Sequence, residues 1–461
     1  YVKDPDLGLH KWIVSFDLNS LYPHLIMQYN ISPETYYDVK TNGVNVDNML
    51  SQQVNLKFAK DKNITIAPNG AMFRRDKQGF LPELMEKMYG DRVIYKKKMM
   101  EAKKEFQKTK DPIYKNEIAR CHNIQMAKKI ALNSAYGAIG NQYFRYFDVK
   151  QAEAITLGGQ LSIRWVERDV NKFMNKVLET DNQNYVVASD TDSIYISMGK
   201  LVDKVCKDKT PQQISDFLDK VSEQKLQKVI DKSFDNLADY VNAFQQKMVM
   251  KREAIANKGI WVAKKRYMLN LFDEEGIRYE YPKLKVMGVE AVKSSTPEIC
   301  RTKIKEAIRV IMNESEDDLI KYVADFKETF KTLSPEEVAF PRSCNNLMKF
   351  ADSSSIYKKG TPIHVKGALI YNYHLHKHKL EMKYPVIRDG DKIKFLMLKI
   401  PNNIKDTVIS FSSRIPYEFD LHKYVDYDLQ FQKTFTDPLK FILDSIGWKL
   451  EREATLEAFF G

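Results

Sequence analysis

The sequence predicts an α+β fold in which an antiparallel sheet is joined to a long pair of helices. Two apolar runs, 185–188 and 194–197, are separated by a short acidic stretch, which indicates a β-hairpin. From 81 to about 108, apolar residues recur at helical spacings, while the opposite face is rich in Lys. Asp111 and Pro112 then provide an N-cap and a first helical residue, so a second helix is expected to run to about residue 138.

The other elements follow in chain order. Residues 12–16 are apolar and predict a strand that ends at Asp17, after which a polar stretch continues to about residue 70. Residues 266–271 and 277–281 predict a second hairpin, which turns at an acidic run ending in Gly. The run Ser-Ser-Thr-Pro at 294–297 marks a boundary, followed by a helical stretch, a mixed region and a polar tail.

The composition favours a polyanionic partner but does not by itself require one. Lys and Arg number 73 against 61 Asp and Glu, and the formal net charge is +12. An excess of this kind favours nucleic acid, although a merely basic soluble protein would show it as well. The four cysteines are scattered, which excludes a close-set zinc site or a disulfide framework and fits a reducing compartment.

The sequence shows no sign of a membrane or secreted protein. No apolar run approaches the roughly 20 residues of a membrane span, and no signal peptide opens the chain. We therefore expect a cytoplasmic protein. The first residue is Tyr1 rather than Met, so we expect the N-terminus to be a cut end.

Three aspartates are predicted to gather where strands end. Asp17 closes the first strand, and Asp190 and Asp192 lie at the tip of the first hairpin, where strand alternation would put both on the same side. Carboxylates this close need cations, and two Mg²⁺ ions about 3.5–4 Å apart, or Mn²⁺ in their place, would satisfy them. The plainer alternatives are an Asp-rich turn at the hairpin tip and a strand-end cap at Asp17.

The helical pair is expected to carry a cluster of three cations. Arg92 and Lys96 lie four residues apart and so share a helix face. Arg92 precedes Asp111 by 19 residues and Lys129 follows it by 18, so a chain folded at Asp111 would place Arg92 and Lys129 side by side. Such a cluster suits a triphosphate. The alternative is a solvated, Lys-rich helix face.

Three motifs, in this order along the chain, resemble those of family B DNA polymerases. Residues 17–23, Asp-Leu-Asn-Ser-Leu-Tyr-Pro, resemble motif A; residues 129–137, with the pattern K-xxx-N-S-x-Y-G, resemble motif B; and residues 190–193, Asp-Thr-Asp-Ser, resemble motif C. Residues 264–267 and 282–288 are similar to the segments with which the family binds duplex DNA. The resemblance covers essentially the whole chain and is greatest to the replicative polymerases of T-even-like bacteriophages.

The resemblance implies a right-hand polymerase fold and DNA-directed DNA synthesis. The palm would comprise 1–78 and 142–288 with the antiparallel sheet, the helical hairpin 79–141 would be the fingers, and 289–461 would form a mostly helical thumb. The implied reaction is the template-directed addition of deoxynucleotides to a primer 3′-hydroxyl by two-metal phosphoryl transfer, in phage DNA replication. Primer-template DNA and dNTP would be the substrates.

The resemblance also assigns roles at the catalytic centre. Asp17, Asp192 and the Leu18 carbonyl would hold the two Mg²⁺ ions, and Asp190 would tune their coordination. Lys129 would contact the nucleotide and act in catalysis with these aspartates.

A further implied set binds the nucleotide and the duplex. Tyr22 would pack under the deoxyribose and exclude a 2′-hydroxyl, while Tyr136 and Gly137 would lie against the nascent base pair. Among the duplex-binding residues, Lys265 would lie nearest the metals. The nucleotide-binding residues would be Ser20, Leu21, Tyr22, Arg92, Lys96, Lys129, Asn133, Tyr136 and Gly137. The duplex-binding residues would be Lys264, Lys265, Arg266, Tyr267, Lys283 and Lys285.

The sequence departs from the family pattern at three places. His24 follows the motif A Pro where Ser is usual, and we expect it to lie behind the site. Glu253 matches a further active-site carboxylate, but Lys251 stands where the phage relatives carry an acid, which leaves a surface ion pair open as an alternative for Glu253. The one D-x-E run that we find, 273–275, lies at a predicted hairpin tip. We therefore expect no proofreading site in this chain, which leaves room for a separate exonuclease chain as a partner.

The last residues predict a docking segment. Leu456, Phe459 and Phe460 would share one face of a helical turn, and exposed aromatics at a chain end cost solubility unless a partner covers them. The tail 455–461 resembles the one with which replicative family B polymerases bind a sliding clamp. The alternative is a tail that packs back on the thumb.

Two other functions stay open at this point. A reverse transcriptase or RNA-dependent polymerase also gathers acids at a hairpin tip, but it lacks the motif B helix and has no use for Tyr22 against the 2′ position. A non-catalytic DNA-binding subunit of a split polymerase would usually have lost one of the acids, whereas Asp17, Asp190 and Asp192 are all present.

Overall fold

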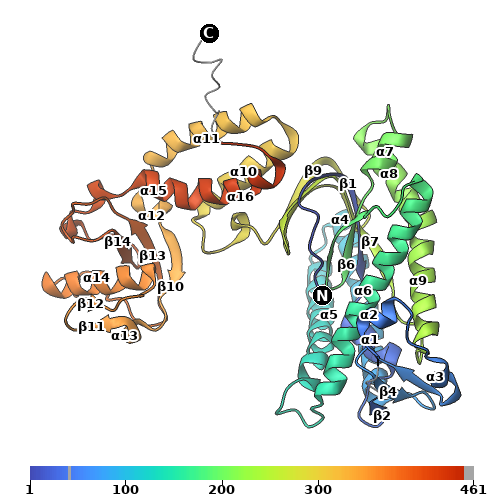
Figure 1. Cartoon of the computed structure of the whole chain (residues 1–461). Helices are drawn as coiled ribbons and strands as arrows, with labels where there is room; N and C mark the ends of the chain where they lie inside the picture. Colours follow the sequence, from blue (N-terminus) through green and yellow to red (C-terminus); the bar gives the residue numbers. More distant parts are fainter. Residues whose placement is uncertain (40–42, 451–461) are drawn as a thin grey trace. The chain divides into compact units, whose positions relative to one another are not determined.

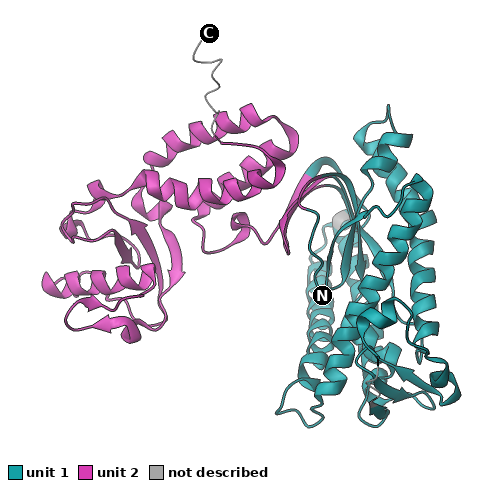
Figure 2. Ribbon diagram, viewed as in Figure 1, with its two compact units in different colours: residues 1–6, 10–257, 271–282 teal, residues 7–9, 258–270, 283–461 magenta. Residues whose placement is uncertain are grey.

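The computed structural model describes residues 1–39 and 43–450, which divide into two compact units (Figures 1 and 2). Unit 1 comprises residues 1–6, 10–257 and 271–282, and unit 2 comprises residues 7–9, 258–270 and the chain from 283 onward. Helices and antiparallel strands both occur throughout, which confirms the α+β class. Within the described residues, no helix is long and apolar enough to cross a lipid bilayer.

A six-stranded sheet carries the predicted strand ends. Its strand order is β5-β6-β1-β7-β8-β9. In the antiparallel pair of β1 and β6, Asp17 lies opposite Ser193, and in the pair of β5 and β6 Asp190 lies opposite the same Ser193. The strands are β1 (Gly8–Leu18), β5 (Val186–Asp190), β6 (Ser193–Ser197), β7 (Met250–Ala263), β8 (Arg266–Glu274) and β9 (Ile277–Met287). Both predicted hairpins are thereby confirmed, and Asp17 and Asp190 come to the same end of the sheet.

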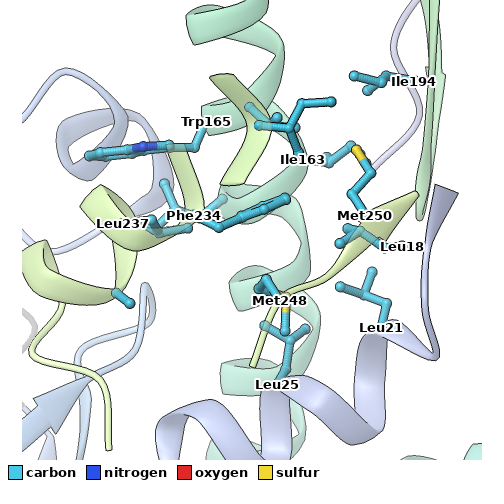
Figure 3. Packing of buried hydrophobic residues seen from close by; sticks show 14 of the residues in the cluster. Leu18, Leu21, Leu25, Ile163, Trp165, Ile194, Phe234, Leu237, Met248 and Met250 are labelled. Carbon is cyan, nitrogen blue, oxygen red and sulfur yellow. The ribbon is translucent and has the colours of Figure 1, made fainter. Parts of the chain in front are cut away.

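The core of unit 1 is built from this sheet and from helices α1 (Leu21–Tyr29), α6 (Val149–Leu178) and α9 (Gln227–Tyr240). Figure 3 shows part of this core, to which the strands and all three helices contribute. Gly159 lets α6 approach α1, because a Cβ at that position would lie 3.2 Å from the Leu21 side chain. The residues labelled in the figure are Leu18, Leu21, Leu25, Ile163, Trp165, Ile194, Phe234, Leu237, Met248 and Met250.

The two long helices are present and lie side by side as an antiparallel pair. They are α4 (Phe80–Thr109) and α5 (Pro112–Ile139). Asp111 caps α5 by accepting a hydrogen bond from the Ile113 amide at 2.9 Å, as its position before Pro112 predicts. An ion pair of 2.7 Å between Asp91 and Lys128 fixes the level at which the helices meet. The sequence predicts that Arg92 lies beside Lys129. Each member of the observed ion pair is the residue directly before its predicted counterpart.

Several smaller elements of unit 1 are not evident from the sequence. The stretch expected to be merely polar forms a three-stranded sheet of order β2-β4-β3. Its strands are only three or four residues long, too short for alternation to stand out. The elements are β2 (Tyr36–Val39), β3 (Ile64–Ile66), β4 (Ala71–Arg74), α2 (Val46–Leu50), α3 (Lys57–Asp61), α7 (Gly199–Val205), α8 (Pro211–Val221) and the π-helical turn η1 (Ser222–Leu226).

Unit 2 combines helices with a second sheet around its own hydrophobic core. Its longer helices are α10 (Glu298–Asn313), α11 (Glu316–Lys331), α14 (Ile363–Lys377) and α16 (Asp437–Ile446). A three-stranded sheet is formed by β13 (Lys392–Met397) between β10 (Phe340–Ser343) and β14 (Val408–Phe411). The sequence predicts a mostly helical region with a mixed part here, and the mixed part corresponds to this sheet and the short elements beside it.

Candidate active site

The three predicted aspartates lie on segments that the backbone holds together. Asp17 is the penultimate residue of β1, and the amide of the next residue, Leu18, donates a hydrogen bond of 2.7 Å to the Asp192 carbonyl. Asp190 ends β5, where its Oδ1 accepts hydrogen bonds from the amide and the hydroxyl of Thr191, at 2.7 and 3.2 Å. Asp192 lies in the turn rather than on a strand, so the strand-alternation argument does not place it; the hydrogen bond from Leu18 does.

A hollow of about 450 Å³ opens beside Asp17. Glu253 on β7 lines the same hollow, and the hydroxyl of Ser15, two residues before Asp17 on the same strand, donates to Glu253 Oε2 at 3.4 Å. Glu253 is therefore a neighbour of Asp17 and not merely part of a distant surface pair. The hollow is lined by Asp17, Asn19, Glu223, Gln227, Lys251, Arg252, Glu253, Glu275 and Gly276.

The donor atoms at this sheet end are of the kind that Mg²⁺ and Mn²⁺ prefer. Carboxylate oxygens of Asp17 and Asp192 and the carbonyl oxygen of Leu18 are hard ligands, and the main-chain hydrogen bond keeps their segments adjacent. Among residues 1–39 and 43–450, no three His, Cys, Asp or Glu side chains already converge as a metal-binding group. The residues present thus fit a site that takes part of its ligands from the main chain and from substrate.

The helix that follows Asp17 places the predicted sugar-contacting residues. Ser20 adopts a left-handed conformation (φ 48°) and starts α1, on which Leu21 is buried and Tyr22 half-buried. The ring of Tyr22 lies 4.8 Å from that of Tyr136, between centroids. Burial, reinforced by the charges of Tyr136 and Asp192, raises the pKa of Tyr22. Tyr136 and Asp192 therefore both act on Tyr22 electrostatically.

Arg92 connects the helical hairpin to α1. Its Nη1 donates to the Ser20 hydroxyl at 3.0 Å, and its Nε is buried without a hydrogen-bond partner in the described part of the chain. A buried, unsatisfied guanidinium N–H is costly, and an anionic ligand would satisfy it. Lys96 and Lys129 are exposed.

The remaining motif B residues leave one face of α5 open. Asn133 is exposed, and a Cβ built on Gly137 would meet nothing within 4 Å. Leu132, directly before Asn133, is buried in the core of unit 1. The helix therefore presents Asn133 and Gly137 outward while Leu132 anchors it.

His24 lies behind this surface, as the sequence predicts. It is buried on α1, with Nδ1 at 2.9 Å from the Ser20 carbonyl and its ring edge-on to Tyr89 at 4.5 Å. Burial lowers the pKa of His24, and the charges of Lys247 and Arg92 act in the same direction. The imidazole is thus a neutral packing group in the neutral pH range.

The predicted duplex-binding residues lie in unit 2, at and after the β7–β8 turn. Lys264 and Lys265 form the turn and are exposed. Lys265 has a left-handed backbone (φ 60°), and its carbonyl would lie 2.2 Å from a Cβ at Gly288, so glycine is required there. Arg266 starts β8.

The other members of the duplex-binding set differ in how far they can reach a ligand. Tyr267 is buried, and its ring stacks on Trp261 with 5.6 Å between centroids. Lys283 on β9 is exposed, and Lys285 is half-buried. Tyr267 is therefore a buried packing residue next to the turn. The members of the set that are exposed at the surface are Lys264, Lys265 and Lys283.

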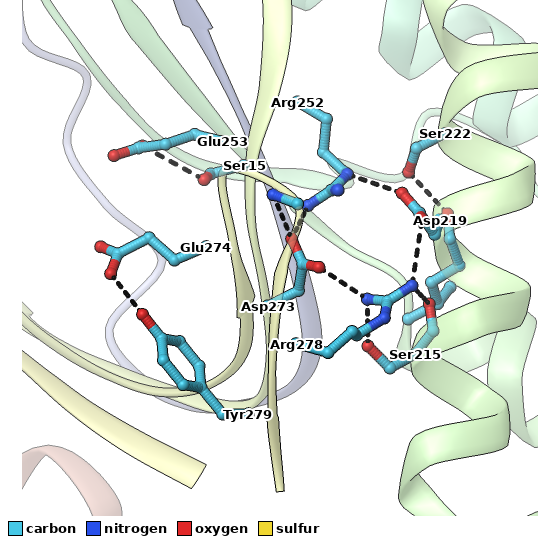
Figure 4. A network of polar contacts seen from close by, with 12 residues as sticks. Ser15, Ser215, Asp219, Ser222, Arg252, Glu253, Asp273, Glu274, Arg278 and Tyr279 are labelled. Carbon is cyan, nitrogen blue, oxygen red and sulfur yellow. Dashed lines mark hydrogen bonds and ion pairs between the residues drawn. The ribbon is translucent and has the colours of Figure 1, made fainter. Parts of the chain in front are cut away.

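A buried ionic network beside the hollow is not predicted from the sequence. Asp273, expected in the turn of the hairpin, lies near the end of β8, is only 1% exposed and pairs with both Arg252 and Arg278 (Figure 4). Arg252 also reaches Asp219 on α8, with Nε at 2.8 Å from Oδ1, and Arg278 donates to the Ser215 hydroxyl at 2.8 Å. These residues come from three distant stretches, and no local pattern links them.

The predicted clamp-binding residues Leu456, Phe459 and Phe460 fall outside the described residues.

Asp17 and Asp190 come to one end of the sheet, the motif B residues lie on α5 of the helical hairpin, and comparison with known proteins gives the family. Residues 1–446 match the sequence profile of DNA polymerase family B, and the chain belongs to that family. It is 32% identical to the DNA-directed DNA polymerase of Escherichia phage RB69 and 31% identical to that of Enterobacteria phage T4, in each case over 100% of this chain and 56% of the relative.

A more distant relative is DNA polymerase 1 of Pyrococcus abyssi, which is 27% identical over 98% of this chain and 47% of its own length. The chain thus spans about half the length of the curated relatives it matches.

Proposed function

We propose that this chain is a DNA-directed DNA polymerase, which adds deoxynucleotides to a primer 3′-hydroxyl in phage DNA replication. The observation that carries the proposal is the hydrogen bond between Leu18 and Asp192, which joins motif A to motif C beside Tyr22. The family and the two phage relatives support the same activity.

Two Mg²⁺ ions, or Mn²⁺ in their place, would be held by Asp17, Asp192 and the Leu18 carbonyl, with Asp190 tuning the coordination. When bound, they lower the pKa of the attacking 3′-hydroxyl and stabilise the charge of the leaving pyrophosphate. Asp190 would tune the coordination mainly through its charge, because its Oδ1 already accepts hydrogen bonds from the amide and the hydroxyl of Thr191.

The nucleotide would be oriented from two helices at once. Arg92, Lys96 and Lys129 hold the triphosphate, and Arg92 can do so without leaving Ser20, since its Nε has no protein partner in the described residues. Tyr22 excludes a 2′-hydroxyl sterically, with its ring supported by Tyr136. The other proposed nucleotide-binding residues are Ser20, Leu21, Asn133 and Gly137.

The parts of the right hand follow in the same proposal. Residues 1–78 and 142–288 form the palm, 79–141 the fingers, and 289–461 the thumb. Exposed Lys264, Lys265 and Lys283 would contact the phosphates of primer-template duplex, which favours cationic side chains irrespective of sequence. A sliding clamp bound through 455–461 and a separate exonuclease chain are further proposed partners, and the host cytoplasm is the proposed site of action.

Primer extension tests the proposal. The protein with Mg²⁺ should extend a labelled primer, whereas Asp17→Ala and Asp192→Ala should abolish extension and keep primer-template affinity, because the duplex grip lies elsewhere. Extension by either variant within tenfold of the unmodified protein would remove that aspartate from the metal site. A protein that binds primer-template but extends nothing would instead be a non-catalytic DNA-binding subunit.

A further inference from the structure

Lys251 belongs to the hollow that Asp17 lines. The hollow brings together four carboxylates, contributed by Asp17, Glu223, Glu253 and Glu275, and only two cationic side chains. One of the two cations is Lys251 and the other is its neighbour in the chain, Arg252. What these two cations contribute to the hollow depends on where each side chain directs its charge.

The charge of Arg252 is committed away from the carboxylates of the hollow. Its guanidinium pairs with Asp219 on one side and with buried Asp273 on the other (Figure 4). Lys251 is exposed and forms no ion pair with any residue of the described chain. Strand alternation puts it on the same face of β7 as Glu253 and opposite Arg252. Lys251 is thus the cation whose charge acts on the hollow itself.

The backbone around Lys251 is held on both sides. Before it, the Met250 carbonyl accepts a hydrogen bond of 2.9 Å from the Gln227 side chain. After it, the Glu253 carbonyl accepts a hydrogen bond of 2.7 Å from the Glu275 amide, and Arg252 is fixed by its two aspartates. The side chain of Lys251 can therefore change its conformation while its Cα atom stays in place.

We propose that Lys251 is a built-in cation that lowers the affinity of the active site for divalent metal, a step that rests on the function proposed above. A positive charge near Asp17 and Glu253 opposes the entry of a second cation by direct Coulomb repulsion. It also offsets the mutual repulsion of the carboxylates when divalent cations leave. In this scheme Lys251 sets the metal affinity of the site through its charge and contacts no reacting atom.

The test is direct metal binding by the full chain. Mn²⁺ binding is measured by electron paramagnetic resonance at low ionic strength, with primer-template DNA and without nucleotide. Lys251→Gln removes the charge and keeps the length of the side chain, Lys251→Arg restores the charge, and Lys228→Gln removes an exposed charge from α9 that does not line the hollow. Each variant is also assayed for primer extension against Mg²⁺ concentration.

Lys251→Gln should bind Mn²⁺ more tightly, on the order of threefold to tenfold for one unit charge at close range. The Mg²⁺ concentration for half-maximal extension should fall in parallel, Lys251→Arg and Lys228→Gln should match the unmodified protein, and added salt should shrink the difference. Unchanged Mn²⁺ affinity in Lys251→Gln overturns the inference. If the KM for nucleotide rises while the Mn²⁺ affinity stays the same, Lys251 is a phosphate ligand instead. An unmodified protein that extends no primer overturns the proposed function itself.

Discussion

The rings of Tyr22 and Tyr136 lie 4.8 Å apart between centroids, at an interplanar angle of 44°. Tyr22 comes from α1 and Tyr136 from the last turn of α5, so this contact fastens the helical hairpin to the helix that follows Asp17. The proposed steric gate for the sugar is therefore built from two helices, and a change in either ring should alter it.

Tyr22→Ala should admit ribonucleotides. Removing the ring opens space where the 2′-hydroxyl would lie. One group contributes ~1–3 kcal/mol to the discrimination of a pocket, so the preference for deoxynucleotides over ribonucleotides should fall by at least about tenfold. Incorporation of a ribo- and a deoxynucleotide is compared on one template. Tyr22→Phe keeps the ring and should keep the preference; an unchanged ratio in the alanine variant would remove Tyr22 from this role.

Arg92→Ala should weaken nucleotide binding rather than folding. Hydrogen bonds to charged groups contribute about 1.5–3 kcal/mol, so the KM for nucleotide should rise at least about tenfold, with a smaller rise for Arg92→Lys. Steady-state kinetics on a fixed primer-template measure it. Arg120→Ala, which removes an exposed arginine from the same hairpin, is the control. Equal effects of the two substitutions would argue against a specific contact by Arg92.

Asp273→Asn should destabilise unit 1 strongly. Asp273 is 1% exposed and pairs with both Arg252 and Arg278, so its loss leaves Arg252 with Asp219 as its only carboxylate partner among the described residues, at a cost of about 1.5–3 kcal/mol for a buried hydrogen bond to a charged group. Asp216, which pairs with Arg278 at 3.1 Å from an exposed position, provides the control, and Asp216→Asn should cost under about 1 kcal/mol. Urea unfolding measures both. Similar midpoints for the two variants would show that the network is not a stabilising one.

The thiols of Cys300 and Cys344 should resist alkylation in the folded protein. Burial raises the pKa of each from 9.0 to about 11, so the reactive thiolate is scarce at pH 8. Since the folded pKa lies above the unfolded one, the stability that these neutral thiols contribute is complete below about pH 9 and is lost as the pH rises towards 11. Mass spectrometry after iodoacetamide treatment checks this, and rapid labelling of either thiol at pH 8 without denaturant would contradict it.

Deleting 455–461 should leave short-primer extension intact and reduce clamp-stimulated long synthesis to the unstimulated level. The reason is the row of Leu456, Phe459 and Phe460, which is expected to occupy an apolar site on a ring-shaped clamp. Product lengths with and without clamp give the answer. Undiminished stimulation, or unfolding of the truncated protein, would favour the alternative that the tail packs on the thumb.

Elements with strong local signals are predicted well from the sequence. The helices at 80–109 and 112–139 lie within a few residues of their expected bounds, because periodicity and the Asp111-Pro112 cap both act locally. The hairpin carrying Asp190 is equally local, since two apolar runs flank its turn. The ion pair of Asp91 with Lys128 lies close to the level that simple counting predicts, because the two helices have the same rise per residue and start from one turn.

Features that depend on distant pairings are not predictable in the same way. The sheet of β2, β3 and β4 consists of strands too short to show alternation, and its strands find one another only in the folded chain. Asp273 looks like an exposed turn residue until Arg252 and Arg278 are placed around it. The neighbourhood of Glu253 and Asp17 likewise depends on β1 and β7 being adjacent, which no local pattern encodes.

The hydrogen bond from the Leu18 amide to the Asp192 carbonyl makes the contact between the segments that carry Asp17 and Asp192 resistant to mutation. It joins two segments that are remote in sequence without using a side chain, so nearly every substitution at either position preserves it. Only proline at position 18 removes the donor. Substitutions of neighbouring side chains such as Lys251 can therefore change the charge of this site while the main-chain contact between the two segments stays in place.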